Sequence, residues 1–448
     1  MTFIERLSDY GISDRKHSSD IRRKARVAIL DTVGCIMAGC REDSVLAASE
    51  WATEFAVNEE ASIIGAHGAC AVGRAAMVNA MAAYACDYDD MCDAGCGHPS
   101  MPVFPVALAL AESYNSTADE FLEAYIYGVE VSAIVGSGFV GSSLSLSWNP
   151  STICGGFGAT VCAARLMNLD ARQTANALAM MTCQVGGTKG NYGTAAKDVS
   201  AGFVSRIAIG CAQLAEKNIV GASDAFEGKN GILACIAPDY NLQAALKRLE
   251  ENISVFLDPG IIPKPYPCCR SNHNAIDGIL KICEEQNVCY EDIAHIHFRI
   301  DKPSFTLEAK NIPTTPEEGK FSTAYCVALA LLNGKLTLDD FSGREIKDPR
   351  IMEIIKKCSS ELDETFGHAH FGNEVEVTMN SGDVYSYRGC YAKGDANNPM
   401  SMEEIKGKFF ACATRYFDEK TALSLYSIII ENEAMCTART LTDIICSQ

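Results

Sequence analysis

The sequence predicts a mainly α protein, with a large all-helical domain formed by both ends of the chain and a smaller inserted α+β domain. Three observations favour this fold class. Helical patterns with capping signals follow one another over the first 250 residues, strand-like alternation begins only near residue 295, and helical patterns return after residue 400. We therefore expect residues 1–255 and 400–448 to form the helical domain, and residues 256–399 to form the α+β domain.

Several segments of the first part carry clear helical signals. Residues 20–39 are amphipathic and end at a glycine, and residues 73–86 are rich in Ala and Met, as suits a tightly packed buried helix. The stretches 117–120 (TADE) and 170–173 (DARQ) are capping boxes, which mark helix starts. Two further helices rich in small residues are expected at 158–167 and 202–217.

The inserted domain is predicted from a change in pattern after residue 252. Four prolines between residues 259 and 267 indicate a stiff linker. Residues 295–300 (HIHFRI) alternate like a strand, and residues 374–389 predict a hairpin around an Asn-Ser-Gly-Asp turn. A helix is expected between them at 320–332. After Pro399, Ser401 begins a helix that leads back to the first domain.

Composition excludes several classes of function. The 448 residues carry a net charge of −19 and no dense Lys/Arg cluster, which argues against a nucleic-acid partner. No run of about 20 apolar residues predicts a membrane-spanning helix. The first twenty residues lack a signal pattern, so we expect a cytoplasmic protein whose 21 cysteines are mostly small buried apolar residues.

The stretch DYDDMCDAGCGHPS, residues 87–100, is the densest group of chemically active side chains. One interpretation is a zinc site, although the spacing fits no standard finger or ribbon; its ligands would be Cys86, Cys92, Cys96 and His98. A second is an acid/base site, in which a nearby carboxylate orients the ring of His98; the candidates are Asp87, Asp89 and Asp90. A third is a solvated polar loop. The residues alone leave all three open.

Three other stretches carry candidate site residues. In SWNPSTICGGFGA, residues 147–159, Asn149 precedes a glycine-rich helix start that attracts anions. In residues 186–202, Lys189 and Lys197 lie among small residues, where a buried lysine needs a partner or an anionic ligand. Each stretch is equally compatible with a purely structural role.

The third stretch is PKPYPCCRSNH, residues 263–273. Its prolines stiffen the backbone, and Lys264, Arg270 and His273 offer donors to a carboxylate. The alternative is a structural hinge. The histidines of a strand, His295 and His297, and of the loop at 367–372, are interpreted as surface residues.

These motifs occur together, and in order, in one known family. DYDD followed by HPS, a Trp-led motif, TAAK, YPCC, KFSTAY and KGDANNP resemble the MmgE/PrpD family from about residue 5 to 440. The set is far more specific than any single motif. The resemblance implies 2-methylcitrate dehydratase, cis-aconitate decarboxylase or iminodisuccinate epimerase-like chemistry. It also implies a homodimer, no metal and no other cofactor, and an α+β domain that acts as a lid over the helical domain.

The resemblance also implies the site. The family's catalytic positions match Asp87, His98, Lys197 and Tyr325 in this chain. Two positions depart from the cis-aconitate decarboxylase pattern, because Asn149 stands where a histidine follows the Trp motif and Cys269 stands where the lid has a histidine, with His273 near enough to compensate. A common Thr-x-x-His pattern is replaced by residues 91–94. These departures weaken the transfer of any one activity.

The family activities share a physical demand, since each develops negative charge on a carbon next to a carboxylate. We expect Lys197, Arg270 and Lys264 to hold the substrate, with Asn149, Cys269 and His273 lining it, and His98 to move the proton. The sequence therefore predicts a cofactor-independent lyase for a small di- or tricarboxylate, by dehydration first and decarboxylation second. The alternatives are an epimerase or isomerase of a related dicarboxylate, such as iminodisuccinate, and a non-catalytic carboxylate-binding relative.

Overall fold

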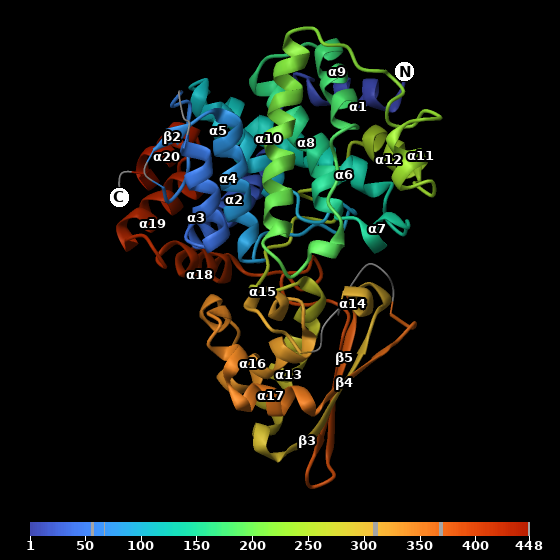
Figure 1. The fold of residues 1–448 in the computed structure, drawn as a ribbon, viewed down its shortest axis with the longest axis vertical. Helices are drawn as coiled ribbons and strands as arrows, with labels where there is room; N and C mark the ends of the chain where they lie inside the picture. Colours follow the sequence, from blue (N-terminus) through green and yellow to red (C-terminus); the bar gives the residue numbers. More distant parts are fainter. Residues whose placement is uncertain (55–57, 67, 308–311, 367–370, 447–448) are drawn as a thin grey trace.

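The computed structural model describes residues 1–54, 58–66, 68–307, 312–366 and 371–446. Figure 1 shows a large helical part that contains both chain termini and, below it, a smaller part with the main β-sheet. Each part has its own apolar core: one joins residues 3–256 with residues 405–445, and the other lies within residues 268–377. This is the mainly α fold with an α+β insertion that the sequence predicts. The precise domain boundaries stay a prediction.

The helical part is built from three groups of elements along the chain. Its first helices are α1 (Phe3–Gly11), α2 (Ser19–Gly39), α3 (Asp43–Thr53), α4 (Val72–Ala85), α5 (Ser100–Ser113) and α6 (Ala118–Ser137). They are followed by α7 (Leu144–Ser147), α8 (Pro150–Leu166), α9 (Ala171–Met181), α10 (Ala196–Glu216), α11 (Ile232–Ile236) and α12 (Leu242–Glu251). The C-terminal helices are α18 (Met402–Ala413), α19 (Glu419–Tyr426) and α20 (Ala438–Cys446), which lie beside α2, α3 and α4 in Figure 1. Strands β1 (Ala61–Ser62) and β2 (Ala69–Cys70) form a short ribbon.

Small residues let the central helices pack closely. Helix α8 contacts α5, α6, α9 and α10. At the α6–α8 crossing, a Cβ on Gly158 would lie 2.2 Å from the carbonyl oxygen of Gly128, so only glycine fits there. Helix α8 begins eight residues before the predicted start at 158, because Asn149 accepts a capping bond from the amide of Ser151 and Pro150 occupies the first turn.

The smaller part carries a four-stranded sheet in the order β4-β3-β5-β6. Its elements are α13 (His273–Gln286), β3 (Ile293–Ile300), α14 (Lys302–Leu307), α15 (Pro316–Gly319), α16 (Thr323–Asn333), α17 (Pro349–Lys356), β4 (Cys358–Leu362), β5 (Asn373–Met379) and β6 (Val384–Gly389). The predicted strand and hairpin are confirmed as β3 and β5–β6. Strand β4 pairs parallel to β3 and was not predicted. We call residues 256–399 the lid.

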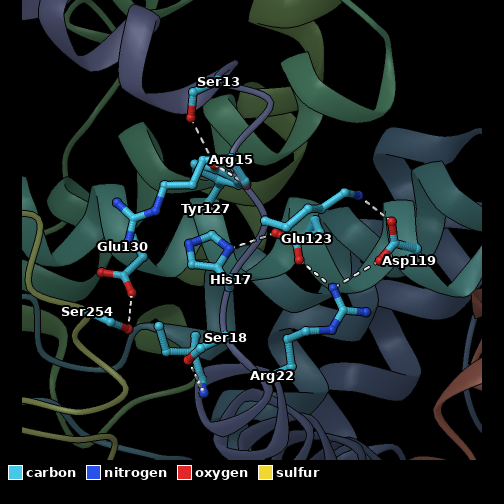
Figure 2. A network of polar contacts seen from close by, with 12 residues as sticks. Ser13, Arg15, His17, Ser18, Arg22, Asp119, Glu123, Tyr127, Glu130 and Ser254 are labelled. Atoms are coloured by element: carbon cyan, nitrogen blue, oxygen red, sulfur yellow. Dashed lines mark hydrogen bonds and ion pairs between the residues drawn. The ribbon is translucent and has the colours of Figure 1, made fainter.

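The loop between α1 and α2 is tied to α6 by a buried polar network (Figure 2). The Nδ1 atom of His17 lies 2.6 Å from the Glu123 carboxylate, which also pairs with Arg22. The hydroxyl of Tyr127 donates to the carbonyl of Arg15 at 2.7 Å. Buried charges of this kind are tolerated because each has a partner. The network anchors the N-terminal segment to the core and lies apart from the residues predicted for the site.

None of the helices in the described part of the chain is sufficiently long and apolar to cross a membrane.

Candidate active site

The site is organised by the turn that follows α4. The backbone of Asp87 has a left-handed conformation, with φ of 52°, which is uncommon for a residue other than glycine. Its carboxylate is buried between two ammonium groups: Oδ1 lies 2.6 Å from Nζ of Lys197, and Oδ2 lies 3.1 Å from Nζ of Lys264. Burial alone would raise the pKa of Asp87, but Lys197, Lys264 and His98 outweigh it and hold the pKa well below its usual range. Asp87 is therefore ionised.

Lys197 comes from the first turn of α10 and is buried. Its ammonium lies over the ring of Tyr84, 3.3 Å from the ring centroid, which adds a cation–π contact to the Asp87 ion pair. Burial lowers the pKa of Lys197, but Asp87 and Asp198 raise it further than burial lowers it. Lys197 is thus a permanent cation in this structure. It suits charge stabilisation better than proton abstraction.

His98 is oriented by Asp89 and not by Asp87. Its Nδ1 lies 3.0 Å from Oδ2 of Asp89, although the two groups are not aligned as a hydrogen bond, and its ring meets the ring of Tyr84 edge to face. The amide of His98 donates to Oγ of Ser151 at 3.0 Å. About 12% of the His98 side chain is exposed, whereas Asp89 is fully buried. His98 is therefore the accessible member of a His–Asp pair, as a general acid or base needs to be.

The third carboxylate of the motif has a structural role. Asp90 accepts hydrogen bonds from the amide and hydroxyl of Ser100, and the Ser100 hydroxyl lies 2.6 Å from that of Tyr125. Burial raises the pKa of Asp90 well above its usual value. Through its bonds to Ser100, Asp90 thus fixes the start of α5, two residues after His98.

Asn149 is brought to the same place by α8. Its side-chain oxygen caps α8, and its Nδ2 donates to the hydroxyl of Tyr84 at 3.4 Å. Burial raises the pKa of Tyr84 well above its usual value, although hydrogen bonds from Asn149 and Tyr192 act in the other direction. Tyr84 therefore touches Asn149, Lys197 and His98 at once, and it holds the three elements that carry them at fixed spacing.

Residues from the lid complete the surroundings of Asp87. Lys264 is 1% exposed, and its ammonium also donates to the carbonyls of Asp87 at 2.8 Å and of Cys268 at 3.2 Å. Cys269 is half-buried; its thiol accepts from the hydroxyl of Ser271 at 3.1 Å. Burial and the charge of Asp87 raise the pKa of the Cys269 thiol, so it is a neutral polar group at the junction of lid and helical part.

Two other predicted lid residues, Arg270 and His273, make their contacts within the lid or with the loop that carries Asp93. Arg270 is buried and pairs with Asp395 at 2.6 Å and Asp93 at 3.6 Å. His273 is fully buried, and its Nε2 lies 3.2 Å from the Cys268 carbonyl. Burial, with Lys264 and Arg270, pushes the pKa of His273 well below its usual value, so its ring is neutral.

Tyr325 lies on α16 in the lid core. Its ring lies 6.1 Å from that of Phe341, centroid to centroid, and within the described residues its hydroxyl has no hydrogen-bond partner. Burial and Glu345 raise the pKa of Tyr325.

The four candidate zinc ligands do not converge. Cys86 packs with Cys35 and Cys412 in a separate apolar cluster, whereas Cys92 and Cys96 lie together in the loop before His98. Across the ranges that the structure describes, no three His, Cys, Asp or Glu side chains are arranged to hold a metal ion. The loop histidines His368 and His370 lie outside those ranges.

Comparison with known proteins places this geometry in a family. The model of the MmgE/PrpD N-terminal domain matches residues 5–245, and that of the MmgE/PrpD C-terminal domain matches residues 266–431. The chain belongs to the MmgE/PrpD family. Asp87 and Lys197 lie in the first match and Cys269 in the second, whereas Lys264 lies in the segment between the two matches of this MmgE/PrpD protein.

Curated relatives are similar over nearly the whole chain at low identity. A protein named cis-aconitate decarboxylase from Homo sapiens is 24% identical over 439 residues, covering 95% of this chain and 90% of the relative. Its namesake from Mus musculus is 22% identical, covering 97% and 91%. A mitochondrial 2-methylcitrate dehydratase from Yarrowia lipolytica is 30% identical over 102 residues, covering 21% of this chain and 20% of the relative.

In this MmgE/PrpD protein, direct contacts join five of the nine predicted site residues, either to one another or through Tyr84: Asp87, His98, Lys197, Lys264 and Asn149. Cys269 makes no such contact, but the charge of Asp87 raises the pKa of its thiol. Among the described residues, no direct contact joins Arg270, His273 or Tyr325 to Asp87 or His98. Their roles stay predictions.

Of the three carboxylates predicted to orient His98, the structure selects Asp89. The sequence reasoning missed Tyr84, Tyr192 and Asp198. Tyr84 lies in an Ala-rich buried helix, where an aromatic residue is indistinguishable from core packing. Asp198 follows Lys197 directly and is buried; burial raises its pKa to about 6, against the lowering effect of Lys197 and Lys320. The adjacency of a lysine and an aspartate at a helix start was the one signal available for it.

Proposed function

We propose that this MmgE/PrpD protein is a cofactor-independent lyase that acts on a small di- or tricarboxylate at a carbon next to a carboxylate. The observation that carries the proposal is the Asp87 carboxylate held between Lys197 and Lys264, directly beside the accessible His98–Asp89 pair. Lys197 and Lys264 each hold an ammonium group beside Asp87. An anionic substrate needs such local cations in a protein whose overall charge is −19.

The chemistry follows from which groups can change their proton. His98 takes the proton from the carbon next to a substrate carboxylate, and Asp89 stabilises the imidazolium that forms. The electron pair spreads into that carboxylate, where the ammonium groups of Lys197 and Lys264 stabilise it. In a dehydration, the neighbouring C–O bond then breaks, and the hydroxide takes the proton back from His98 and leaves as water. The site ends in its starting state.

Dehydration is our first choice, and decarboxylation is the second candidate. In decarboxylation, the C–C bond to a carboxylate breaks and CO₂ leaves; His98, protonated from solvent beforehand, donates that proton to the carbon and is then protonated again by water. The relatives that match over 90% or more of this chain are named cis-aconitate decarboxylase, which favours this second candidate. Asn149 and Cys269 stand where those enzymes are expected to carry histidines, and the amide of Asn149 cannot replace a histidine as a proton donor.

The two other candidate functions, an epimerase and a non-catalytic binding protein, predict different results. An epimerase needs proton-transfer groups on opposite faces of the carbon and loses no group from the substrate. A non-catalytic relative would bind the carboxylate and leave it unchanged. We also propose, from the family resemblance, that the protein forms a homodimer; size-exclusion chromatography with light scattering tests the dimer.

Proton NMR in D₂O tests the function with a panel of carboxylates: citrate, 2-methylcitrate, cis- and trans-aconitate, malate, tartrate and iminodisuccinate. Loss of water or CO₂ from one compound identifies the reaction and the substrate. Deuterium exchange without a new product identifies an epimerase. Binding without exchange or product, measured by calorimetry on the same panel, contradicts the lyase.

A further inference from the structure

Three lysine ammonium groups bind three backbone carbonyls around Asp87. Lys320 donates to the carbonyl of Ala85 at 2.9 Å, Lys264 to that of Asp87 at 2.8 Å and Lys408 to that of Tyr88 at 2.7 Å. The last carbonyls of a helix have no partner within it, and they form the negative end of its dipole. Lys320 therefore caps the last carbonyl of α4, and Lys264 and Lys408 bind carbonyls of the turn that follows the helix.

Lys320 differs from the other two lysines in its partners. Lys264 also pairs with the carboxylate of Asp87, and Lys408 also pairs with that of Asp31 at 2.6 Å. Lys320 is only 6% exposed, and in the described part of the chain its ammonium forms no ion pair with a carboxylate. A buried lysine with a single hydrogen bond is costly.

The backbone of Lys320 is hydrogen-bonded to the lid segment that carries Cys269. Its carbonyl accepts from the amide of Cys269 at 2.9 Å and from Nδ2 of Asn272 at 3.0 Å. The next residue, Phe321, packs against Tyr192, and its ring centroid lies 5.7 Å from Nζ of Lys197. Residue 320 thus connects the lid wall of the site, through one hydrogen bond, to the turn that carries Asp87.

We propose that Lys320 is a positioning residue, whose ammonium latches the lid onto the end of α4 and keeps the Cys269 segment aligned with Asp87. Of the two experiments that test this inference, only the measurement of kcat rests on the proposed function. The bond from Lys320 to Ala85 forms when the lid is seated and breaks when the lid lifts, so substrate access and the geometry around Asp87 change together.

The melting temperature of a Lys320 variant distinguishes a latch from a residue that only stabilises the fold. Replacing a buried ammonium group that has no carboxylate partner removes its desolvation cost, which offsets the loss of its one hydrogen bond, to the Ala85 carbonyl. Lys320→Met should therefore leave the melting temperature unchanged or higher while it loosens the latch. A residue kept for stability would show the opposite pattern.

Hydrogen exchange measured by mass spectrometry tests the latch without any substrate. The variants are Lys320→Met, Lys320→Arg, which keeps a donor at the same place, and Lys335→Met, which makes the same chemical change at an exposed lid position. We expect Lys320→Met to speed exchange over residues 86–91 and 266–272, Lys320→Arg to restore part of the protection, and Lys335→Met to change nothing. Unchanged exchange over residues 86–91 and 266–272 in Lys320→Met overturns the proposal, as does a lowered melting temperature with faster exchange throughout the protein.

The kinetic arm uses the substrate found by the NMR panel. We expect Lys320→Met to lower kcat about 10- to 100-fold, the range for a small misplacement of a catalytic group, with Lys320→Arg recovering part of it. A fall in kcat without faster exchange means that Lys320 touches the substrate instead, and overturns the latch. If no carboxylate reacts with the wild-type protein, the proposed function fails, and the exchange experiment alone decides the latch.

Discussion

Replacing Asp198 by asparagine should stabilise the protein at neutral pH and leave it unchanged in acid. Asp198 lies in the first turn of α10, next to Lys197, and is buried. Burial raises its pKa from 3.8 to about 6, although Lys197 and Lys320 act in the other direction. A rise of roughly two pKa units corresponds to about 3 kcal/mol against the ionised form in the folded protein.

The sign of the pH dependence follows from proton binding. Between about pH 4 and 6, folded Asp198 keeps its proton while the unfolded chain has released it, so stability falls as pH rises. Above pH 6 both states are ionised, and the full cost remains. Asparagine is neutral throughout and avoids this cost. The difference between variant and wild type should therefore be zero below pH 4 and reach up to about 3 kcal/mol at pH 7.5.

Calorimetric melting at pH 3.5, 5, 6 and 7.5 checks this difference. For 448 residues, about 3 kcal/mol corresponds to a rise of roughly 3 °C in the melting temperature. Asp9→Asn, at an exposed position of α1, is the matched control and should shift nothing. A variant that melts lower than wild type at pH 7.5, or whose gain is the same at every pH, would refute the account of Asp198.

Three further substitutions probe the site. Lys264→Met removes one of the two cations on Asp87, so the pKa of that carboxylate should rise, and the acid limb of the kcat/KM profile should move toward neutral pH; an unmoved limb contradicts the pairing. Asn149→His adds a second titratable group and should increase turnover of cis-aconitate and add a pH-dependent limb to its profile, whereas unchanged kinetics would exclude residue 149 from the reaction. Ser100→Ala leaves the buried acid Asp90 without its main donor and should cost about 1–3 kcal/mol in urea unfolding, with a loss below 0.5 kcal/mol as the contrary result.

Much of the fold was readable because its signals are local. The capping boxes at Thr117 and Asp170 are both formed, and the helices they start were predicted. The hairpin of β5 and β6 follows from alternation and a turn within sixteen residues. Strand β4 was missed because its stretch, CSSEL, has no alternation; its pairing with β3 depends on a partner about sixty residues away in the sequence.

The sequence predicted candidate residues for the site, but not how their side chains are arranged. The motifs brought Asp87, His98 and Lys197 forward as candidates, but sequence gives no distance between side chains. Whether Asp87 or Asp89 orients His98 depends on the turn after α4, where the left-handed backbone of Asp87 directs its carboxylate to the lysines and leaves Asp89 for the histidine. Such choices are set by tertiary packing.

Proton transfer by His98 is the central claim of this account, and deuterium incorporation measures it most directly. Once the panel has identified a substrate, proton NMR in D₂O compares wild type with His98→Asn, and with His295→Asn at an exposed lid position as control. The account predicts that His98→Asn loses at least about 100-fold in product formation and in deuterium uptake at the reacting carbon, while the substrate still binds within about threefold of wild type. His98→Asn that exchanges and turns over like His295→Asn would contradict it.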